Sequence, residues 1–249
     1  MDGHLLRDKV VLVSGGTRGI GAGIAAAALR EGASVVVSGR RAPAGSGAYF
    51  VRCDVSDVES GRAAVAATVD RHGRIDCLVN AAGLTTRGTL LDTTPELFDE
   101  HVAVNLRGPF FLMQAAVQDM LRRGAPGTIV NIISSSELGG QPYLAPYVAA
   151  KAGLAGLTRN AAHAHRFDRI RINGLDIGWT DTEGEDQIQR RFHNADDDWR
   201  ERAAEKLPMG KLAQVDEIAD FVVFLLSPRS GVVTGSILDW DQQVFGATD

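Results

Sequence analysis

Short apolar runs alternate along this chain with longer amphipathic stretches. Each run spans four to six residues and is rich in Val, Ile and Leu, which is typical of strands buried on both faces of a parallel sheet. The stretches between them are typical of helices that connect such strands in βαβ units. Seven strands are predicted: Val10–Ser14, Ser34–Ser38, Tyr49–Cys53, Cys77–Asn80, Thr128–Ile133, Arg171–Leu175 and Ser236–Asp239. The pattern predicts an α/β fold, a doubly wound parallel sheet of about seven strands with helices on both faces.

Helices are predicted in the gaps between these strands. The Ala-rich segments Ile20–Arg30 and Arg62–Arg71 have the pattern of helices that cover a sheet. Pro95–Leu121 and Tyr147–His165 are longer, and they are apolar enough for burial on more than one side. A Thr-Thr-Pro sequence opens the first of these two, which is the cap-then-proline arrangement of a helix start.

The composition changes between Gly178 and Pro208. This segment begins with an acidic stretch, has a helical pattern over Gln187–Phe192 and continues as Asn-Ala-Asp-Asp-Asp-Trp. It follows the sixth predicted strand, where open α/β sheets place their ligand crevice. We interpret residues 178–208 as a substrate lid within a single domain of residues 1–249.

Length and composition are those of one ordinary globular domain. The chain has 249 residues, of which 45% are apolar and 23% are charged, and open α/β sheets of this size form one domain. The net charge of −5 argues against nucleic-acid binding, which requires a basic patch. No apolar run approaches the ~18 residues of a membrane span, and the first residues lack the apolar stretch of a signal peptide. We expect a cytoplasmic protein without a nucleic-acid or membrane partner.

The cysteines and histidines indicate neither a disulfide nor a metal site. Cys53 and Cys77 each lie beside a predicted buried strand, so two reduced core thiols are favoured over a disulfide. The six histidines show no metal-binding spacing, and His163 and His165 fall on different faces of a predicted helix. No metal is expected.

A glycine cluster follows the first predicted strand. Gly15, Gly19 and Gly21 open the first helix with the spacing Gly-x-x-x-Gly-x-Gly. Such glycines permit a tight turn and a close backbone approach to a pyrophosphate bound at the helix N-terminus. The alternative is a plain strand-to-helix turn, but the position after the first strand favours a dinucleotide site.

Tyr147 and Lys151 are four residues apart in a predicted helix, so their side chains project from the same face. At roughly 5 Å and an effective dielectric constant of about 20, the ammonium would stabilise the phenolate by about 3 kcal/mol, or roughly two pKa units. A tyrosine shifted in this way is a usable acid and base near neutral pH. The alternative for an isolated match is a surface helix pair.

The chain resembles the short-chain dehydrogenase/reductase family in its short, single-domain form. The resemblance runs from Lys9 to about Asp241, and it implies a Rossmann-like domain. The matching motifs, in chain order, are Gly15–Gly21, Asp54-Val55, Asn80–Gly83, Asn105, Ile129–Ser134, Tyr147–Lys151 and Gly178 with Thr182.

The resemblance implies a role for each of four catalytic residues. Ser134 would hold the substrate oxygen, and Tyr147 would give or take the proton. Lys151 would tune Tyr147 and hold the nicotinamide ribose, and Asn105 would keep a water in place for proton relay. Of three consecutive serines, Ser134 is selected because it lies thirteen residues before Tyr147, as in the family pattern. The next two are interpreted as loop or cap residues.

The resemblance also implies the cofactor contacts. Asp54 would accept a hydrogen bond from the adenine amino group, with capping of the next helix as the structural alternative. Asn80 and Gly83 would shape the loop beneath the cofactor, with a simple turn as the alternative. The full implied set is Gly15, Thr17, Arg18, Gly19, Ile20, Gly21, Arg40, Asp54, Val55, Asn80, Gly83, Tyr147, Lys151 and Thr182.

The end of the second strand favours NADP over NAD. An NAD site usually presents a carboxylate there to the ribose 2′-hydroxyl, whereas a 2′-phosphate is met by arginine. Here the strand ends with Arg40 and Arg41, and Arg18 lies within the glycine loop. The alternative is that Arg40 and Arg41 are solvated loop charges.

Three positions depart from the common family pattern without removing a catalytic group. Ile177 stands where a proline is usual, Ala81 replaces a second asparagine, and Asp241-Gln242-Gln243 replaces Asp-Gly-Gly. The family implies a homo-oligomer, a tetramer or dimer, and the last change weakens that expectation because it lies near the C-terminus.

The leading hypothesis is an NADP-dependent oxidoreductase that interconverts a secondary alcohol and a ketone. Alternatives are an isomerase or dehydratase that retains its hydride, and a regulatory NADP(H)-binding protein without turnover. Residues Gly178–Trp199 carry a net charge of −5, and such a field would favour neutral polar substrates such as a sugar or cyclitol. Alternatively, these carboxylates cap helices and face water.

Overall fold

The computed structural model describes residues 4–43, 45 and 47–244. Its sheet has seven parallel strands in the order β3-β2-β1-β4-β5-β6-β7. The strands are β1 (Val10–Ser14), β2 (Ser34–Gly39), β3 (Tyr49–Arg52), β4 (Cys77–Asn80), β5 (Gly127–Ile132), β6 (Ile170–Ile177) and β7 (Ile237–Trp240). All seven predicted strands are confirmed within two residues at each end. The strand order reverses between β1 and β4, which is where doubly wound sheets bind their ligands.

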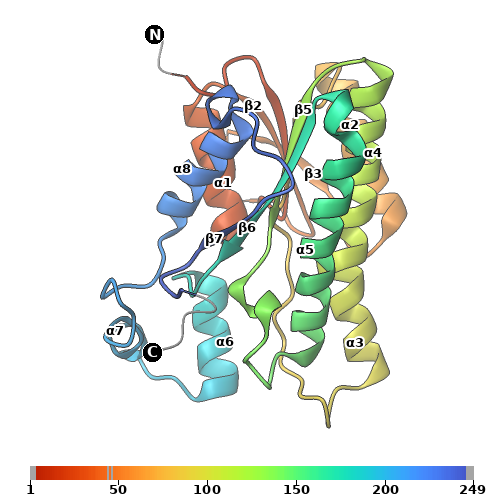
Figure 1. The fold of residues 1–249 in the computed structure, drawn as a ribbon. Coiled ribbons are helices and arrows are strands. Elements are labelled where there is room, and N and C mark those ends of the chain that lie inside the picture. Colours follow the sequence, from red (N-terminus) through yellow and green to blue (C-terminus); the bar gives the residue numbers. More distant parts are fainter. Residues whose placement is uncertain (1–3, 44, 46, 245–249) are drawn as a thin grey trace.

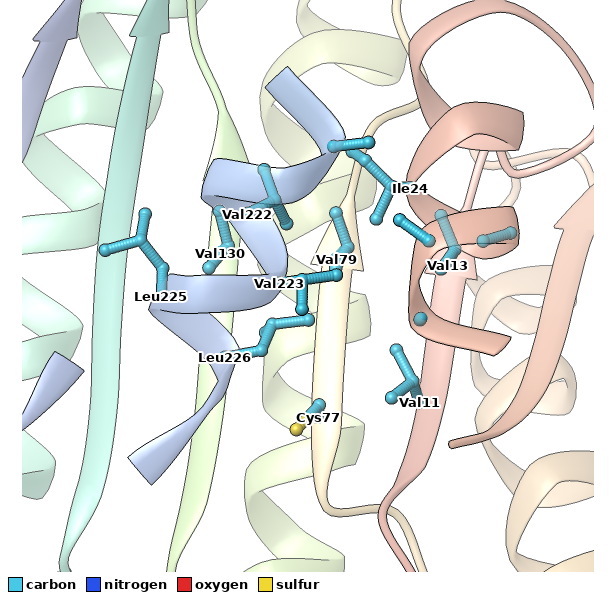
Figure 2. Packing of buried hydrophobic residues seen from close by; sticks show 14 of the residues in the cluster. Val11, Val13, Ile24, Cys77, Val79, Val130, Val222, Val223, Leu225 and Leu226 are labelled. Carbon is cyan, nitrogen blue, oxygen red and sulfur yellow. The ribbon is translucent and has the colours of Figure 1, made fainter. Parts of the chain in front are cut away.

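Helices cover both faces of this sheet (Figure 1). The helices of the described chain are α1 (Gly19–Arg30), α2 (Val58–His72), α3 (Pro95–Val102), α4 (Gly108–Arg122), α5 (Ala145–His165), α6 (Glu183–His193), α7 (Trp199–Ala204) and α8 (Val215–Leu226). One core lies under α1 and α8, where Val222, Val223 and Leu226 of α8 lie over Val79 and neighbouring strand residues (Figure 2). A second core lies on the opposite face, under α2, α4 and α5. Burial of these apolar side chains is the main stabilising contribution to the fold.

The predicted long helix Pro95–Leu121 is interrupted. A π-helical turn, η1 (Ala103–Arg107), separates α3 from α4. Pro109 has no backbone N–H for the carbonyl of Asn105, so the α-helical hydrogen-bond pattern cannot continue through this point. The helix start is confirmed, because the Thr94 hydroxyl accepts from the Leu97 N–H at 3.3 Å.

Both cysteines are buried and unpaired. Burial raises the pKa of Cys53, and it raises the pKa of Cys77 to about 12. Reduced core thiols were expected, and the structure confirms them. Within the described residues, no helix combines the length and apolarity needed to cross a bilayer.

Candidate active site

Tyr147 and Lys151 project from the first two turns of α5 beside the end of β5. Both side chains are buried, with 8% and 4% of their surface exposed. Lys151 Nζ donates to the carbonyl of Ile132, the last residue of β5, at 2.7 Å, and it lies 5.6 Å from the centroid of the Tyr147 ring. The spacing of four residues therefore places the phenol and the ammonium on one helix face, as predicted.

Ser134 follows β5 and completes this group. Its side chain hydrogen-bonds to Tyr147 and lowers the pKa of that phenol. It also accepts from the backbone N–H of Ser136 at 3.3 Å, and so it caps the short 3-10 helix η2 (Ser135–Leu138). The Ser136 hydroxyl instead donates to Gln141 at 2.7 Å. The structure thus brings Ser134, and not a neighbouring serine, to the tyrosine.

The expected lowering of the Tyr147 pKa is wrong in this structure. Burial raises the pKa of Tyr147 to about 12, and the charges of Asp176 and Glu185 act in the same direction. The Arg87 guanidinium and the Ser134 hydroxyl oppose this rise. The phenol is therefore neutral at pH 7, which is the protonation state of a general acid.

The glycine loop between β1 and α1 approaches other backbone segments closely. A Cβ at Gly21 would lie 2.3 Å from the Gly15 carbonyl oxygen, and one at Gly15 would lie 2.5 Å from the backbone nitrogen of Ala82. Gly15 also has a φ of +74°, in the left-handed region that glycine adopts without strain. No larger residue fits at either position.

The N-terminus of α1 is suited to an anion. Its N-cap residue, Arg18, makes no side-chain capping bond, and the first turn carries no acidic residue. The first backbone N–H groups of a helix have no intrahelical acceptor, and together with the helix dipole they favour a phosphate. The cradle and the uncapped helix fit a dinucleotide, with Gly15, Gly19 and Ile20 around its pyrophosphate.

Comparison with known proteins settles the family. A family model described as enoyl-(acyl carrier protein) reductase matches residues 15–242. The chain belongs to the short-chain dehydrogenase/reductase family. It is 36% identical over 258 residues to an L-rhamnose 1-dehydrogenase (NAD(P)(+)) of Azotobacter vinelandii, which covers 97% of this chain and 98% of the relative.

Two further relatives support this assignment. A trans-4-hydroxycyclohexanecarboxylate dehydrogenase of Sinomonas cyclohexanicum is 36% identical over 251 residues, covering 94% of this chain and 92% of the relative. The crystal structure of a variant actinorhodin polyketide ketoreductase with NADPH superimposes with a TM-score of 0.87 at 32% identity, covering 93% and 95% of the two chains. This short-chain dehydrogenase/reductase is therefore an oxidoreductase enzyme.

The arginines expected to select NADP lie at the start of α1 and directly after β2. Arg18 and Arg40 are exposed, and no salt bridge to either occurs among the described residues. Thr17 of the glycine loop packs against the end of β2. A Cβ at Gly39, the last residue of β2, would lie 2.9 Å from the Thr17 hydroxyl. The glycine loop thus packs against the strand end that carries Arg40.

Asp54 and Val55 follow β3 at the same end of the sheet. The Asp54 carboxylate accepts from the backbone N–H of Ser56 at 3.0 Å and from its hydroxyl at 2.7 Å. The alternative that Asp54 caps the next helix is wrong, since Asp57 caps α2. The hydrogen bonds from Ser56 lower the pKa of Asp54, and the charge of Arg40 acts in the same direction. Val55 packs against Gly108, where a Cβ would lie 2.5 Å from the Val55 carbonyl oxygen.

Asn80 and Gly83 shape the loop after β4. Asn80 Nδ2 donates to Asn131 Oδ1 at 2.8 Å, and Asn131 Nδ2 donates to the Thr158 hydroxyl at 2.8 Å, which ties β4, β5 and α5 together. A Cβ at Gly83 would lie 3.6 Å from Asn105 Oδ1. The loop therefore contacts the π-helical turn directly.

Asn105 uses its whole side chain to hold this loop. Its Oδ1 accepts from the Leu84 N–H at 2.9 Å, and its Nδ2 donates to the Leu84 carbonyl at 3.0 Å. The side chain is fully buried. Any water held by Asn105 would therefore be held by its backbone carbonyl, which lacks its α-helical donor because of Pro109.

His101 lies one turn before Asn105 and was missed by the sequence analysis. The fully buried ring packs edge-on to Tyr147, with 6.2 Å between ring centroids. Its Nδ1 is 3.3 Å from Asn105 Nδ2, and its Nε2 is 3.0 Å from the Thr86 hydroxyl. An amide nitrogen only donates, so Nε2 carries the hydrogen. Burial lowers the pKa of His101, and the ring is neutral.

Residues 178–208 form α6, α7 and their connections beside the glycine loop. Thr182 caps α6 by accepting from the Glu185 N–H at 3.0 Å, and its Cγ2 would lie 3.9 Å from a Cβ at Gly19. Helix α6 begins at Glu183, four residues before the predicted start. Whether this segment moves as a lid remains a prediction.

Four carboxylates of this segment are paired with arginines: Asp181, Asp186, Asp196 and Asp197. Arg200 bonds to Asp181 at 2.8 Å and to Asp186 at 2.9 Å, while Arg190 bonds to Asp186 and Asp197 at 2.9 Å each. The hydrogen bond from Trp199, together with the bonds from Arg190 and Arg200, lowers the pKa of Asp186 to about 2. This pairing offsets part of the negative charge of the segment.

Two more charged groups near Tyr147 were also missed. Arg87, half-buried in the loop after β4, donates to His193 Nε2 of α6 and lies 5.1 Å from the centroid of the Tyr143 ring. Asp176 lies in β6 and is fully buried. A signal for Asp176 exists in the sequence, since a carboxylate in a fully buried strand is rare.

Within the described residues, no cluster of His, Cys, Asp or Glu side chains is arranged to hold a metal.

Proposed function

We propose that this enzyme is an NADP-dependent oxidoreductase that interconverts a secondary alcohol and a ketone, with Tyr147 as the acid and base. The observation that carries this proposal is the convergence of Ser134, Tyr147 and Lys151 at the end of β5. The side chains of Ser134 and Tyr147 are hydrogen-bonded to each other, and Lys151 lies on the same face of α5 as Tyr147. A regulatory protein that only binds NADP(H) would not need this arrangement.

Each residue has a defined task in ketone reduction. The Ser134 hydroxyl positions the substrate carbonyl oxygen beside the Tyr147 hydroxyl, which donates its proton to that oxygen as charge develops there. Lys151 would hold the nicotinamide ribose, and its ammonium stabilises the phenolate left on Tyr147. When bound, the nicotinamide supplies or accepts the hydride. In alcohol oxidation the same residues act in reverse.

Protons would return to Tyr147 through Lys151 and water. We propose that the Asn105 backbone carbonyl holds one such water, because Pro109 deprives that carbonyl of its α-helical donor. The Asn105 side chain and His101 fix the loop and the helix turn around it.

The surroundings of Tyr147 support a polar, sugar- or cyclitol-like substrate. Ser134 hydrogen-bonds to the phenol, and Arg87 and Glu185 are close enough to shift its pKa, so these polar groups lie near the reacting oxygen. Glu185 Oε1 accepts from Trp179 and Gln189, at 2.8 and 2.7 Å. Hydroxyl groups of a substrate can form hydrogen bonds with such groups, whereas an apolar ring cannot.

One screen tests this function and the charge preference together. We expect NADPH-dependent reduction of ketones and NADP⁺-dependent oxidation of polyols, cyclitols and sugars by the purified protein. Matched neutral and carboxylated cyclic ketones, compared at low and high salt, test whether the acidic segment repels anions. A preference for the carboxylate at low salt would contradict the neutral preference. Absence of turnover with every class would contradict the proposed function.

We also propose that the enzyme is a cytoplasmic homo-oligomer. Apolar side chains remain exposed around α3 and α4, including Leu90 at 89%, Leu91 at 96% and Phe110 at 42%. A second copy of the chain would remove this surface from water. We expect a dimer or tetramer in solution, which light scattering after size-exclusion chromatography measures. A monomer at micromolar concentration would contradict this assembly.

A further inference from the structure

Asp176 is a buried carboxylate without a hydrogen-bond partner. The residue is 0% exposed, and both carboxylate oxygens lack a donor among the described residues. Such groups are rare, because removing a carboxylate from water without compensation destabilises the fold. A charge kept under these conditions calls for a functional explanation.

The strand geometry directs Asp176 to the catalytic face of the sheet. Side chains alternate along β6, and Leu175 and Ile177 lie in the core under α1 and α8. Ile172, an even number of residues from Asp176, lies in the opposite core under α4 and α5. Asp176 therefore faces the side of the sheet from which α5 presents Tyr147 and Lys151.

Lys151 is the positive charge that acts on Asp176. The Lys151 ammonium donates to the carbonyl of Ile132, which is in register with Leu175, the neighbour of Asp176. The remaining ionisable groups around Asp176 are acidic or neutral: Glu137 of η2, Asp239 of β7, Asp241 after β7, and Tyr147 of α5. Asp239 is in register with Asp176 but is exposed.

We propose that Asp176 is a positioning residue of the active site, the buried counter-ion that keeps Lys151 charged. This inference rests on the proposed function, since it assigns Asp176 to the same proton-transfer site. Asp176 acts through Lys151 and does not touch the substrate.

The ionisation equilibria agree with this role. Burial lowers the pKa of Lys151 to about 8, and Asp176 raises it. Burial and the neighbouring carboxylates raise the pKa of Asp176 to about 7, and Lys151 lowers it. Without Asp176 the pKa of Lys151 would fall further, and the lysine would lose its charge at a lower pH. The ammonium would then neither hold the ribose nor stabilise the phenolate.

The buried Asp176 should reduce the free energy of unfolding at neutral and alkaline pH. The folded-state pKa of Asp176 is above the unfolded value of about 3.9, so the ionised carboxylate opposes folding. The wild type therefore loses stability as the pH rises through about 7. Asp176→Asn removes this loss, and its thermal midpoint at pH 8 should equal or exceed that of the wild type.

The test compares Asp176→Asn with Asp239→Asn, the same substitution at the exposed neighbour. NADPH affinity, by nicotinamide fluorescence, and kcat/KM for reduction are measured from pH 6 to 9. We expect Asp176→Asn to resemble the wild type at pH 6 and to weaken progressively above it. At pH values above the lysine pKa, each unit by which that pKa falls should lower the charged fraction about tenfold. Asp239→Asn should shift the profile far less than Asp176→Asn does, because Asp239 is exposed and water screens its charge.

Three outcomes overturn the proposal: parallel pH profiles for Asp176→Asn and the wild type, an equal shift in Asp239→Asn, or a uniform loss with a lower thermal midpoint. Asp176→Ser repeats the test if the Asn variant does not fold. The affinity titration measures cofactor binding and does not require turnover. If the wild type binds NADH more tightly than NADPH, the titration is carried out with NADH. A wild type that binds cofactor but reduces nothing would overturn the proposed function, while the titration would still decide the role of Asp176.

Discussion

Replacing Tyr147 by Phe is expected to lower kcat by about 10²–10⁴-fold, the usual contribution of a positioned proton donor. The phenyl ring can still pack edge-on to His101 at the observed centroid separation of 6.2 Å. Only the hydroxyl next to Ser134 is lost, so the affinity for NADPH should change little. Steady-state reduction at saturating NADPH and a fluorescence titration of NADPH measure the two quantities.

Tyr49→Phe is the matched control for this variant. Tyr49 begins β3, is 42% exposed and packs with Arg71, with 4.2 Å between the guanidinium carbon and the ring centroid. It lies outside the proposed active site, and its loss should leave kcat unchanged. If Tyr147→Phe retained turnover within about threefold of the wild type, the assignment of the acid would be wrong.

Removing Arg18 or Arg40 is expected to weaken NADPH binding much more than NADH binding. A charge-assisted bond to a phosphate contributes about 1.5–3 kcal/mol. Each substitution by Ala should therefore raise the Kd for NADPH roughly 10- to 150-fold. NADH lacks the 2′-phosphate, and its affinity should change far less. Fluorescence titrations of both cofactors with each variant provide the comparison.

Arg166→Ala is the control for a general loss of positive charge. Arg166 lies in η3 (Arg166–Asp168), before the amino end of β6 and thus at the opposite edge of the sheet from the crevice. Its loss should affect neither cofactor. Tighter binding of NADH than NADPH by the wild type would mean that Arg18 and Arg40 do not select the cofactor.

The seven strands and the placement of Tyr147 and Lys151 on one helix face were predictable from the sequence for simple physical reasons. Strands buried on both faces must be apolar over their whole length, so each appears as a short run such as Val10–Ser14. Helical periodicity by itself places Tyr147 and Lys151 on one face. A thirteen-residue spacing selected Ser134, and the structure places its side chain against Tyr147.

The interruption of the long helix between α3 and α4 was harder to predict from the sequence. The Gly108-Pro109 sequence contains the cause, since Pro109 cannot donate to Asn105. The pattern of apolar residues nevertheless continues across it, because η1 and α4 both bury apolar side chains and α3 packs against α5. Periodicity reports which face is buried, and it is insensitive to a single extra residue in one turn.

The sequence by itself thus determined the fold class, the glycine cradle and the pairing of Tyr147 with Lys151 on one helix face, because these depend on local spacing and on the length of apolar runs. Only the tertiary structure decided the electrostatics. The pKa of Tyr147 depends on burial and on Asp176, Glu185 and Arg87, which are far from it in the chain and meet it only after folding. Likewise, a count of charges in residues 178–199 omits Arg200, whose bonds to Asp181 and Asp186 neutralise part of the expected field. Electrostatic energies depend on distance and on exclusion of water, and neither is encoded in sequence separation.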